Sequence, residues 1–315
     1  MALARVVDEC SRAMRDTQAT WVKVIDSETK RQMNQTAKEV PGGLVEYVMA
    51  LANDMIKSAD FVEALLGKLE PLVSEKYRQP INATLNEAMD GYLNVAKKCI
   101  QTLIDLIFND LKPATKLLFT NTWYNDDPMV QIIETIQDYM RDYQAHLNPS
   151  LFDLLVEDII DTFLITYLTA LRRASKLKNP SAADRIRDDV RKSFGFFATV
   201  KRNRDELESY FDVLDSLLKL ITASKTMFFL DYWPFAKQYG SNLGYVSNLL
   251  KARDDINRTQ ANEIVSGIKY LMILLMILQL DNCKRKVEEE GMEEPEHSIF
   301  NRLREFLAYV FQRHS

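Results

Sequence analysis

Apolar residues recur at helical spacing along most of this chain, and the pattern is broken at a small number of prolines and glycines. Residues 2–40 contain neither Pro nor Gly and return to an apolar side chain every three or four positions, which predicts one long helix. The break that begins at Pro41 is followed by a second apolar stripe, which predicts a helix at 44–70. A third long helix is expected at 72–110, with Pro80 either bending it or lying near its first turns.

Prolines also mark the starts of the later helices. Asp127 and Pro128 have the residue types of an N-cap and a first helical position, so a helix is expected from there to about residue 146. Ser150 and Ser181 each follow an Asn-Pro pair and precede an acid by three residues, which resembles a capping box and predicts two more helix starts. The remaining helices are expected at about 151–173, 181–199, 204–222, 225–238, 241–252 and 254–280.

The helix at 151–173 is apolar on most of its circumference, with a narrow polar stripe that includes Glu157 and Asp161. Such a helix has packing partners on several sides, so we expect it to be central in a multi-helix bundle. No stretch of the chain shows sustained strand alternation. The predicted fold is therefore all-α, with long antiparallel helices that lie side by side and form a rod.

The glycine content supports long helices and argues against several classes of function. The chain has 315 residues, of which 9 are Gly and 9 are Pro, whereas average usage near 7% would give about 22 glycines. Gly-rich phosphate loops and tight hairpin turns are therefore disfavoured. The formal net charge of -5 argues against nucleic-acid binding. The aromatic clusters at 194–197 and 228–235 have apolar neighbours, so we expect them to pack in the core rather than to stack on bases.

The cysteines indicate a protein of a reducing compartment, and the apolar runs provide neither a secretory signal nor a membrane span. Cys10, Cys99 and Cys283 are odd in number and too far apart for a Cys-x-x-Cys pair, so neither a disulfide framework nor a cysteine zinc site is expected. The first fifteen residues carry several charges and do not resemble a secretory signal. The longest apolar run, 270–278, has nine residues, against the ~20 that a membrane-spanning helix needs. We therefore expect a cytoplasmic protein.

The all-α enzymes most worth testing are the isoprenoid synthases, which hold magnesium and diphosphate with an Asp-Asp-x-x-Asp cluster. The chain has three Asp-Asp pairs, none of which is followed by the third acid, so we interpret them as helix N-caps or solvated surface acids. No nucleotide-loop motif occurs, and we expect no cofactor, metal or small-molecule substrate. The pairs are Asp126-Asp127, Asp188-Asp189 and Asp254-Asp255, and the third positions hold Val130, Lys192 and Arg258.

Three basic clusters are candidates for contact with acidic lipid headgroups or with an acidic partner. The first cluster, at 172–178, lies in the last turn before a proline, where the helix dipole alone favours cations. The second cluster opens a connection between two helices, and the third is near the end of the chain. The candidate contact residues are Arg172, Arg173, Lys201, Arg202, Arg204, Lys284, Arg285 and Lys286.

A long pattern of ordinary residues runs through most of residues 1–269. Its clearest segments are DLIFNDLKPATK at 105–116, IETIQDY at 133–139, LFDLLVED at 151–158, YLTAL at 167–171 and RIRDDV at 185–190. In order and spacing these segments resemble the C-terminal half of the exocyst subunit Sec-six family, also called exocyst component three, and the fungal branch is the nearest match. No short motif of this family transfers residue by residue.

The resemblance implies a non-catalytic protein. It implies a rod of stacked helical bundles of the tethering-complex type and a subunit of the exocyst, which docks secretory vesicles at the plasma membrane during exocytosis. The implied partners are other exocyst subunits and plasma-membrane SNARE proteins, and the implied location is the cytoplasm and the periphery of the plasma membrane at sites of secretion. The alternatives are a general helical protein-interaction scaffold and, more distantly, an all-α enzyme of the isoprenoid-synthase type.

Two departures from the family pattern qualify this resemblance. Family members are much longer, so we expect this chain to be a C-terminal fragment or a truncated gene product. Residues 270–283 interrupt a helix that runs directly into a basic segment in fungal relatives, and we hypothesise that they are a translated intron, with a buried apolar final helix as the alternative. The expected divisions are an N-proximal bundle at 1–125, a C-terminal bundle at 126–269 and an atypical tail at 270–315.

Overall fold

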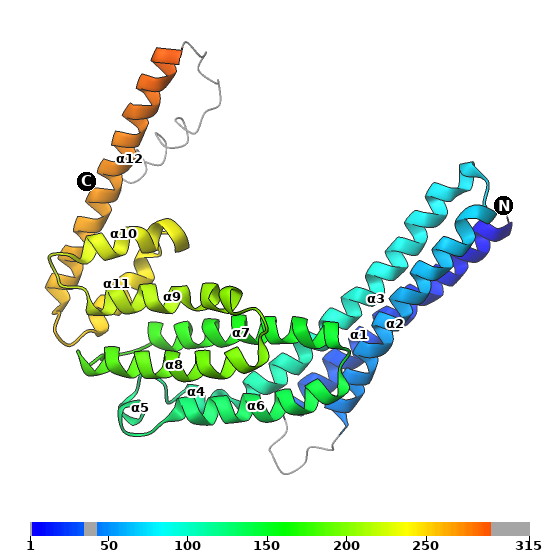
Figure 1. The fold of residues 1–315 in the computed structure, drawn as a ribbon, viewed down its shortest axis with the longest axis horizontal. Coiled ribbons are helices and arrows are strands. Elements are labelled where there is room, and N and C mark those ends of the chain that lie inside the picture. Colours follow the sequence, from blue (N-terminus) through cyan, green and yellow to red (C-terminus); the bar gives the residue numbers. More distant parts are fainter. Residues whose placement is uncertain (1, 35–42, 291–315) are drawn as a thin grey trace. The chain divides into compact units, whose positions relative to one another are not determined.

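The computed structural model describes residues 2–34 and 43–290, and in these ranges all regular elements are helices (Figure 1). The predicted all-α fold is confirmed. The elements are α1 (Ala2–Asn34), α2 (Leu44–Leu69), the 3-10 helix η1 (Glu70–Leu72), α3 (Glu75–Asp110), α4 (Lys112–Thr115), α5 (Asn121–Asn125), α6 (Pro128–His146), α7 (Pro149–Arg172), α8 (Ser181–Val200), α9 (Arg204–Thr222), α10 (Phe228–Tyr239), α11 (Leu243–Ala252) and α12 (Arg258–Glu290).

The chain divides into two compact units, Met1–Thr222 and Ala223–Ser315. The boundaries that the sequence suggested after residues 125 and 269 stay predictions, because compact units and the bundles of a family need not share boundaries.

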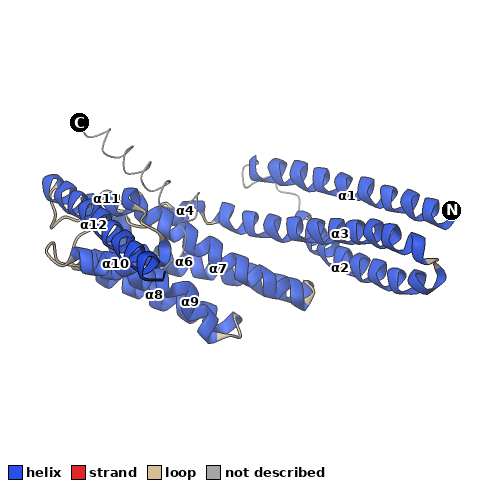
Figure 2. Cartoon of the chain, turned by 90° about the horizontal axis from the view of Figure 1, so that it is seen from above, coloured by secondary structure: helices blue, strands red, loops and turns tan. Residues whose placement is uncertain are grey.

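Unit 1 begins with three long helices, in which α3 lies between α1 and α2 (Figure 2). Pro80 is the sixth residue of α3, so it lies inside the helix, where a proline removes one hydrogen bond of the backbone ladder. The helices α1 and α3 approach closely at Gly91, since a Cβ there would lie 2.1 Å from Oε1 of Gln18. The buried amide of Gln18 donates from Nε2 to the carbonyl oxygen of Ala88 at 2.9 Å, which fixes the register of the two helices.

The second part of unit 1 is built around α7, as the sequence predicts. This helix contacts α3, α4, α6 and α9, and ten of its side chains are buried. Ile159 and Ile160 are completely shielded from solvent, whereas the neighbouring carboxylates of Asp158 and Asp161 lie on the less buried side. Burial, together with the charge of nearby Glu157, raises the pKa of both of these carboxylates.

The helix starts follow the expected prolines, but the capping groups differ from the prediction in two cases. Asp127 caps α6 as predicted, because its side chain accepts from the backbone N–H of Val130 at 3.4 Å. The capping-box interpretation of Ser150 is wrong. Asn148 caps α7 instead, accepting from the Ser150 N–H at 3.0 Å, because the helix begins before the serine. Ser181 is already the first residue of α8 and makes no capping hydrogen bond, so that interpretation is wrong as well.

The short helices α4 and α5 lie in a stretch that the sequence indicates as a connection. Each has too few residues to show a period. Phe119 and Trp123 are 3% and 0% exposed, and their ring centroids lie 4.7 Å apart. The connection is therefore part of the core of unit 1. Phe119 has a φ of 60°, an uncommon conformation for a bulky residue.

Unit 2 contains α10, α11 and α12. The guanidinium of Arg253 donates to the carbonyl oxygen of Ala223 at 2.8 Å and to the carboxylate of Asp255 at 3.0 and 2.7 Å. It therefore joins the first residue of unit 2 to the connection between α11 and α12. Helix α12 continues to residue 290, beyond the expected end at 280. Tyr270 and Leu274 on it are 68% and 41% exposed.

Two further expectations can be compared with the structure. The aromatic residues at 194–197 and 228–235 pack largely as predicted, since Phe197, Phe228, Tyr232 and Phe235 are all buried. Over the residues that the structure describes, no helix combines the length and the apolar character needed to cross a membrane.

Candidate interaction surfaces

The first basic cluster is at the C-terminal end of α7. Arg172 is the last residue of this helix and Arg173 is its C-cap, and both side chains are exposed. Neither makes an ion pair with any residue in the described ranges. Both cations are therefore available to a partner.

Lys201, in the second cluster, is engaged within the chain. Its side chain is 9% exposed, and Nζ lies 2.6 Å from Oε1 of Glu157 and 3.0 Å from Oε2 of Glu206. Burial disfavours the ammonium charge, but the hydrogen bonds to both glutamates outweigh this effect and raise the pKa of Lys201. The residue therefore connects α7 to the start of α9. Arg204 pairs with Glu208 at 3.4 Å.

The remaining candidates are Arg202 and the three residues of the third cluster. Arg202 is exposed, and no ion pair of its side chain with another described residue is present. Lys284, Arg285 and Lys286 lie on the last turns of α12, and their side chains are outside the part of the chain whose side chains are described. Their role stays a prediction.

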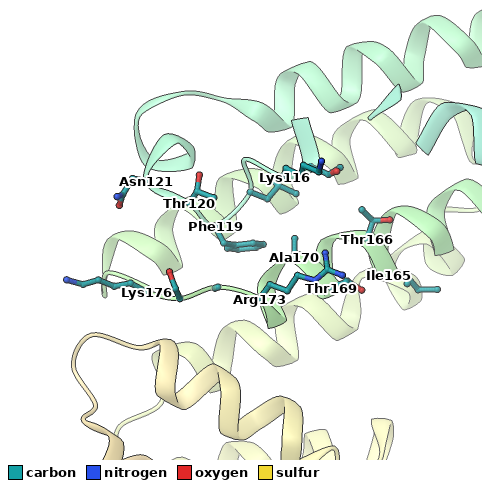
Figure 3. A pocket seen from close by; sticks show the side chains of 14 residues that line it. Lys116, Phe119, Thr120, Asn121, Ile165, Thr166, Thr169, Ala170, Arg173 and Lys176 are labelled. Carbon is teal, nitrogen blue, oxygen red and sulfur yellow. The ribbon is translucent and has the colours of Figure 1, made fainter. Parts of the chain in front are cut away.

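A groove of about 740 Å³ opens beside the end of α7, between residues 115–121 and residues 165–176. We call it the α7 groove. Figure 3 shows the side chains of Lys116 and Arg173 on opposite walls, with the ring of Phe119 between them. The complete lining consists of Thr115, Lys116, Leu118, Phe119, Thr120, Asn121, Ile165, Thr166, Thr169, Ala170, Arg173, Ala174, Ser175 and Lys176.

The charge of the α7 groove is entirely positive. Lys116, Arg173 and Lys176 are its only charged lining residues, and all three side chains are exposed. The sequence identified Arg173 and Lys176 as part of a cluster but gave no reason to include Lys116. A lysine in a connection carries no signal until the fold brings it next to α7.

The acid pair Asp188-Asp189 contains a residue that the sequence misplaced. Asp189 is 0% exposed, so its interpretation as an N-cap or a solvated surface acid is wrong. Its Oδ2 accepts from Nε1 of Trp123 and from the hydroxyl of Tyr167, both at 2.9 Å. Burial raises the pKa of Asp189 to about 6, although these two hydrogen bonds act in the opposite direction.

The neighbouring Asp188 and the distant Asp127 meet at two cations of α8. Lys192 contacts both carboxylates, and Arg185 lies 3.3 Å from Oδ1 of Asp127 and 3.6 Å from Oδ2 of Asp188. The hydrogen bond from Lys192 is the main cause that lowers the pKa of Asp188. This cluster joins α8 to the start of α6. No group of His, Cys, Asp and Glu that could hold a metal ion occurs among the described residues.

Comparison with known proteins gives a consistent set of relatives. The family model of exocyst complex component Sec6 matches residues 1–258. Exocyst complex component SEC6 of Saccharomyces cerevisiae is 29% identical over 92% of this chain and 38% of its own length. The corresponding component of Schizosaccharomyces pombe is 25% identical over 82% of this chain and 34% of its own length.

A solved structure shares the arrangement of helices as well. The crystal structure of the C-terminal domain of the exocyst subunit Sec6p is 27% identical in sequence, with a TM-score of 0.78. The match covers 93% of this chain and 76% of that chain. The chain spans well under half the length of the two yeast relatives. Because the family model covers more than half of the sequence, the chain belongs to the exocyst complex component Sec6 family.

Proposed function

We propose that this chain is a non-catalytic, partner-binding part of an exocyst subunit, which contributes to the docking of secretory vesicles at the plasma membrane. The strongest support is the family match over residues 1–258, combined with the shared fold of the Sec6p C-terminal domain. Its partners in this proposal are other exocyst subunits and plasma-membrane SNARE proteins. It acts in the cytoplasm and, at sites of secretion, at the membrane periphery.

The physical basis of the proposal is a rigid helical scaffold that presents exposed side chains to partners. Helix α7 is held on several sides by α3, α4, α6 and α9, and the cations at its C-terminal end are therefore displayed at a fixed position. Preorganised side chains lose less conformational entropy when a partner binds. The buried polar groups around Asp189 and Lys201 maintain this scaffold rather than form a catalytic site.

A pull-down tests the proposal. The tagged chain is incubated with a fungal lysate, and bound proteins are quantified by mass spectrometry against a tagged helical bundle of unrelated sequence and similar charge. We expect enrichment of exocyst subunits and of a plasma-membrane SNARE protein. Recovery of neither, with the chain folded by circular dichroism, contradicts the proposal.

The enzyme alternative has a separate test. An isoprenoid synthase needs clustered acids that bind magnesium, whereas Asp127 and Asp188 are both paired with Lys192. We expect no magnesium-dependent turnover of prenyl diphosphates by the purified chain. Measurable diphosphate release under those conditions would refute the non-catalytic assignment.

A further inference from the structure

We propose that the α7 groove is a docking site for an acidic segment of a partner protein that also carries an apolar side chain. The inference rests on the proposed function, because it names the chemistry of a partner that such a subunit would bind. Lys116 and Arg173, on the two walls, would contact carboxylates of this segment, and Ile165 would contact its apolar side chain.

The charge of the groove favours an acidic partner. Its lining contains three cations and no acid, although the whole chain has a formal net charge of -5. None of these cations forms an ion pair with another residue in the described ranges. An acidic segment would complement the groove, since charge complementarity increases association rate and specificity.

Two other grooves of unit 1 show that this imbalance is not a general property of its surface. The groove between α8 and α9 is lined by Arg187 and Arg191 together with three acids, Glu208, Asp212 and Asp215. The charges in the groove beside α1 and α2 are those of Asp54 and Lys57, which pair with each other at 3.4 Å. The α7 groove differs from both because its cations lack internal counter-charges.

The helix dipole accounts for only part of this arrangement. Arg173 and Lys176 follow the C-terminus of α7, where cations are favoured without any partner. Lys116 comes from the connection after α4 and lies on the opposite wall, as Figure 3 shows. The fold thus brings together cations from two segments of the sequence, and the capping of α7 does not require that convergence.

The rest of the lining favours a polypeptide over a bare anion or a lipid headgroup. Ile165 is 64% exposed, although it is on α7, whose other large aliphatic side chains are mostly buried. The lining also includes the apolar side chains of Phe119 and Ala170 and several threonines (Figure 3). An inorganic anion would leave this apolar surface uncovered. A segment with carboxylates and one apolar side chain would cover both kinds of surface.

A peptide selection tests the proposal with a defined probe. A phage-displayed library of random 12-residue peptides is selected on the purified chain, and the enriched peptides are synthesised with a fluorescein label for anisotropy titration. We expect acidic peptides with at least one apolar residue, whose binding weakens with increasing salt. Their affinity for the double variant Lys116→Glu/Arg173→Glu should be lower by at least about tenfold, because two attractions become repulsions.

A matched double variant separates local from general charge effects. Lys97 and Lys219 are exposed cations outside the groove, so Lys97→Glu/Lys219→Glu also changes the formal net charge from -5 to -9. We expect it to bind the selected peptides like the wild-type chain. The proposal is overturned if no peptide is enriched, if the enriched peptides are not acidic, or if the two double variants lose affinity equally.

A third arm addresses lipid. Vesicles with 30% phosphatidylserine are sedimented with each protein, and we expect no difference between the two double variants. A loss of vesicle binding that is specific to Lys116→Glu/Arg173→Glu would assign the groove to membranes and overturn the protein-segment proposal. Because these assays use purified protein and defined probes, their failure is distinguishable from failure of the pull-down.

Discussion

The buried carboxylate of Asp189 allows a quantitative prediction about pH. Asp189→Asn keeps an oxygen that can accept from Trp123 and Tyr167, but the side chain no longer ionises. In the wild-type chain, the pKa of Asp189 rises from 3.8 to about 6 on folding. A difference of roughly 2 units corresponds to about 3 kcal/mol.

The direction in which the free energy of unfolding changes with pH follows from proton binding. The folded chain binds the Asp189 proton more tightly than the unfolded chain, so this group's contribution to stability is fully present below pH 3.8 and is lost as the pH rises through about 6. The Asn variant has no such loss. Its free energy of unfolding should therefore increase relative to wild type by up to about 3 kcal/mol between pH 4 and pH 7.

Urea unfolding at several pH values measures this difference. Trp123 fluorescence reports on unit 1 when Trp21 and Trp233 are replaced by Phe in every protein compared. Asp188→Asn is a control of opposite sign. Lys192 lowers the pKa of Asp188, so stability from that group is present above pH 3.8 and is lost as the pH falls. A flat difference for Asp189→Asn, or one with the sign of the Asp188→Asn difference, would refute the reasoning.

Asp189→Ala tests the hydrogen bonds themselves. This variant removes the acceptor of two buried donors, each of which costs about 1–3 kcal/mol when it is left unpaired. We expect Asp189→Ala to be less stable than Asp189→Asn at every pH. Equal stability of the two variants would show that the donors find other partners.

Three further outcomes are expected. Gly195→Ala should raise the free energy of unfolding of unit 1 by about 0.5–1 kcal/mol in urea, because the added Cβ would meet no atom within 4 Å. Gly91→Ala should lack this gain, because the added Cβ would displace the buried side chain of Gln18. Cys99 should react with a maleimide only after unfolding, because burial raises the pKa of its thiol to about 12. Exposed Cys10 should react in the folded chain, and peptide mapping of the labelled protein checks both residues. Arg253→Lys should lower the unfolding midpoint of unit 2 by thermal circular dichroism, since lysine cannot make the two-pronged contact; an unchanged midpoint contradicts this.

The positions of the helices could be predicted because the signals are local. Apolar spacing of three to four residues and the prolines at 128 and 149 act over one or two helical turns, and the observed bounds of α6 and α9 agree with the expected ones. The capping of α6 by Asp127 is local in the same sense. The two serine caps were wrong because a helix start can shift by one or two residues without changing the apolar pattern.

The functional surface could be predicted only in part. Arg173 belongs to a basic cluster that the sequence shows, but Lys116 on the opposite wall of the groove is brought there by tertiary structure. The two hydrogen-bond donors of Asp189 are 66 and 22 residues away, and the Glu157 partner of Lys201 is 44 residues away. A single sequence contains no periodic signal for such pairs. The sequence therefore predicts surface positions for Asp189 and Lys201, whereas the structure buries both side chains.

Direct reconstitution tests the proposal that this chain binds other exocyst subunits. The purified chain is mixed with each of the other exocyst subunits of the same organism and is examined by size-exclusion chromatography with light scattering. We predict that at least one subunit co-elutes with the chain as a complex whose mass is the sum of both. Separate elution of the folded chain from every subunit at micromolar concentration would contradict the account.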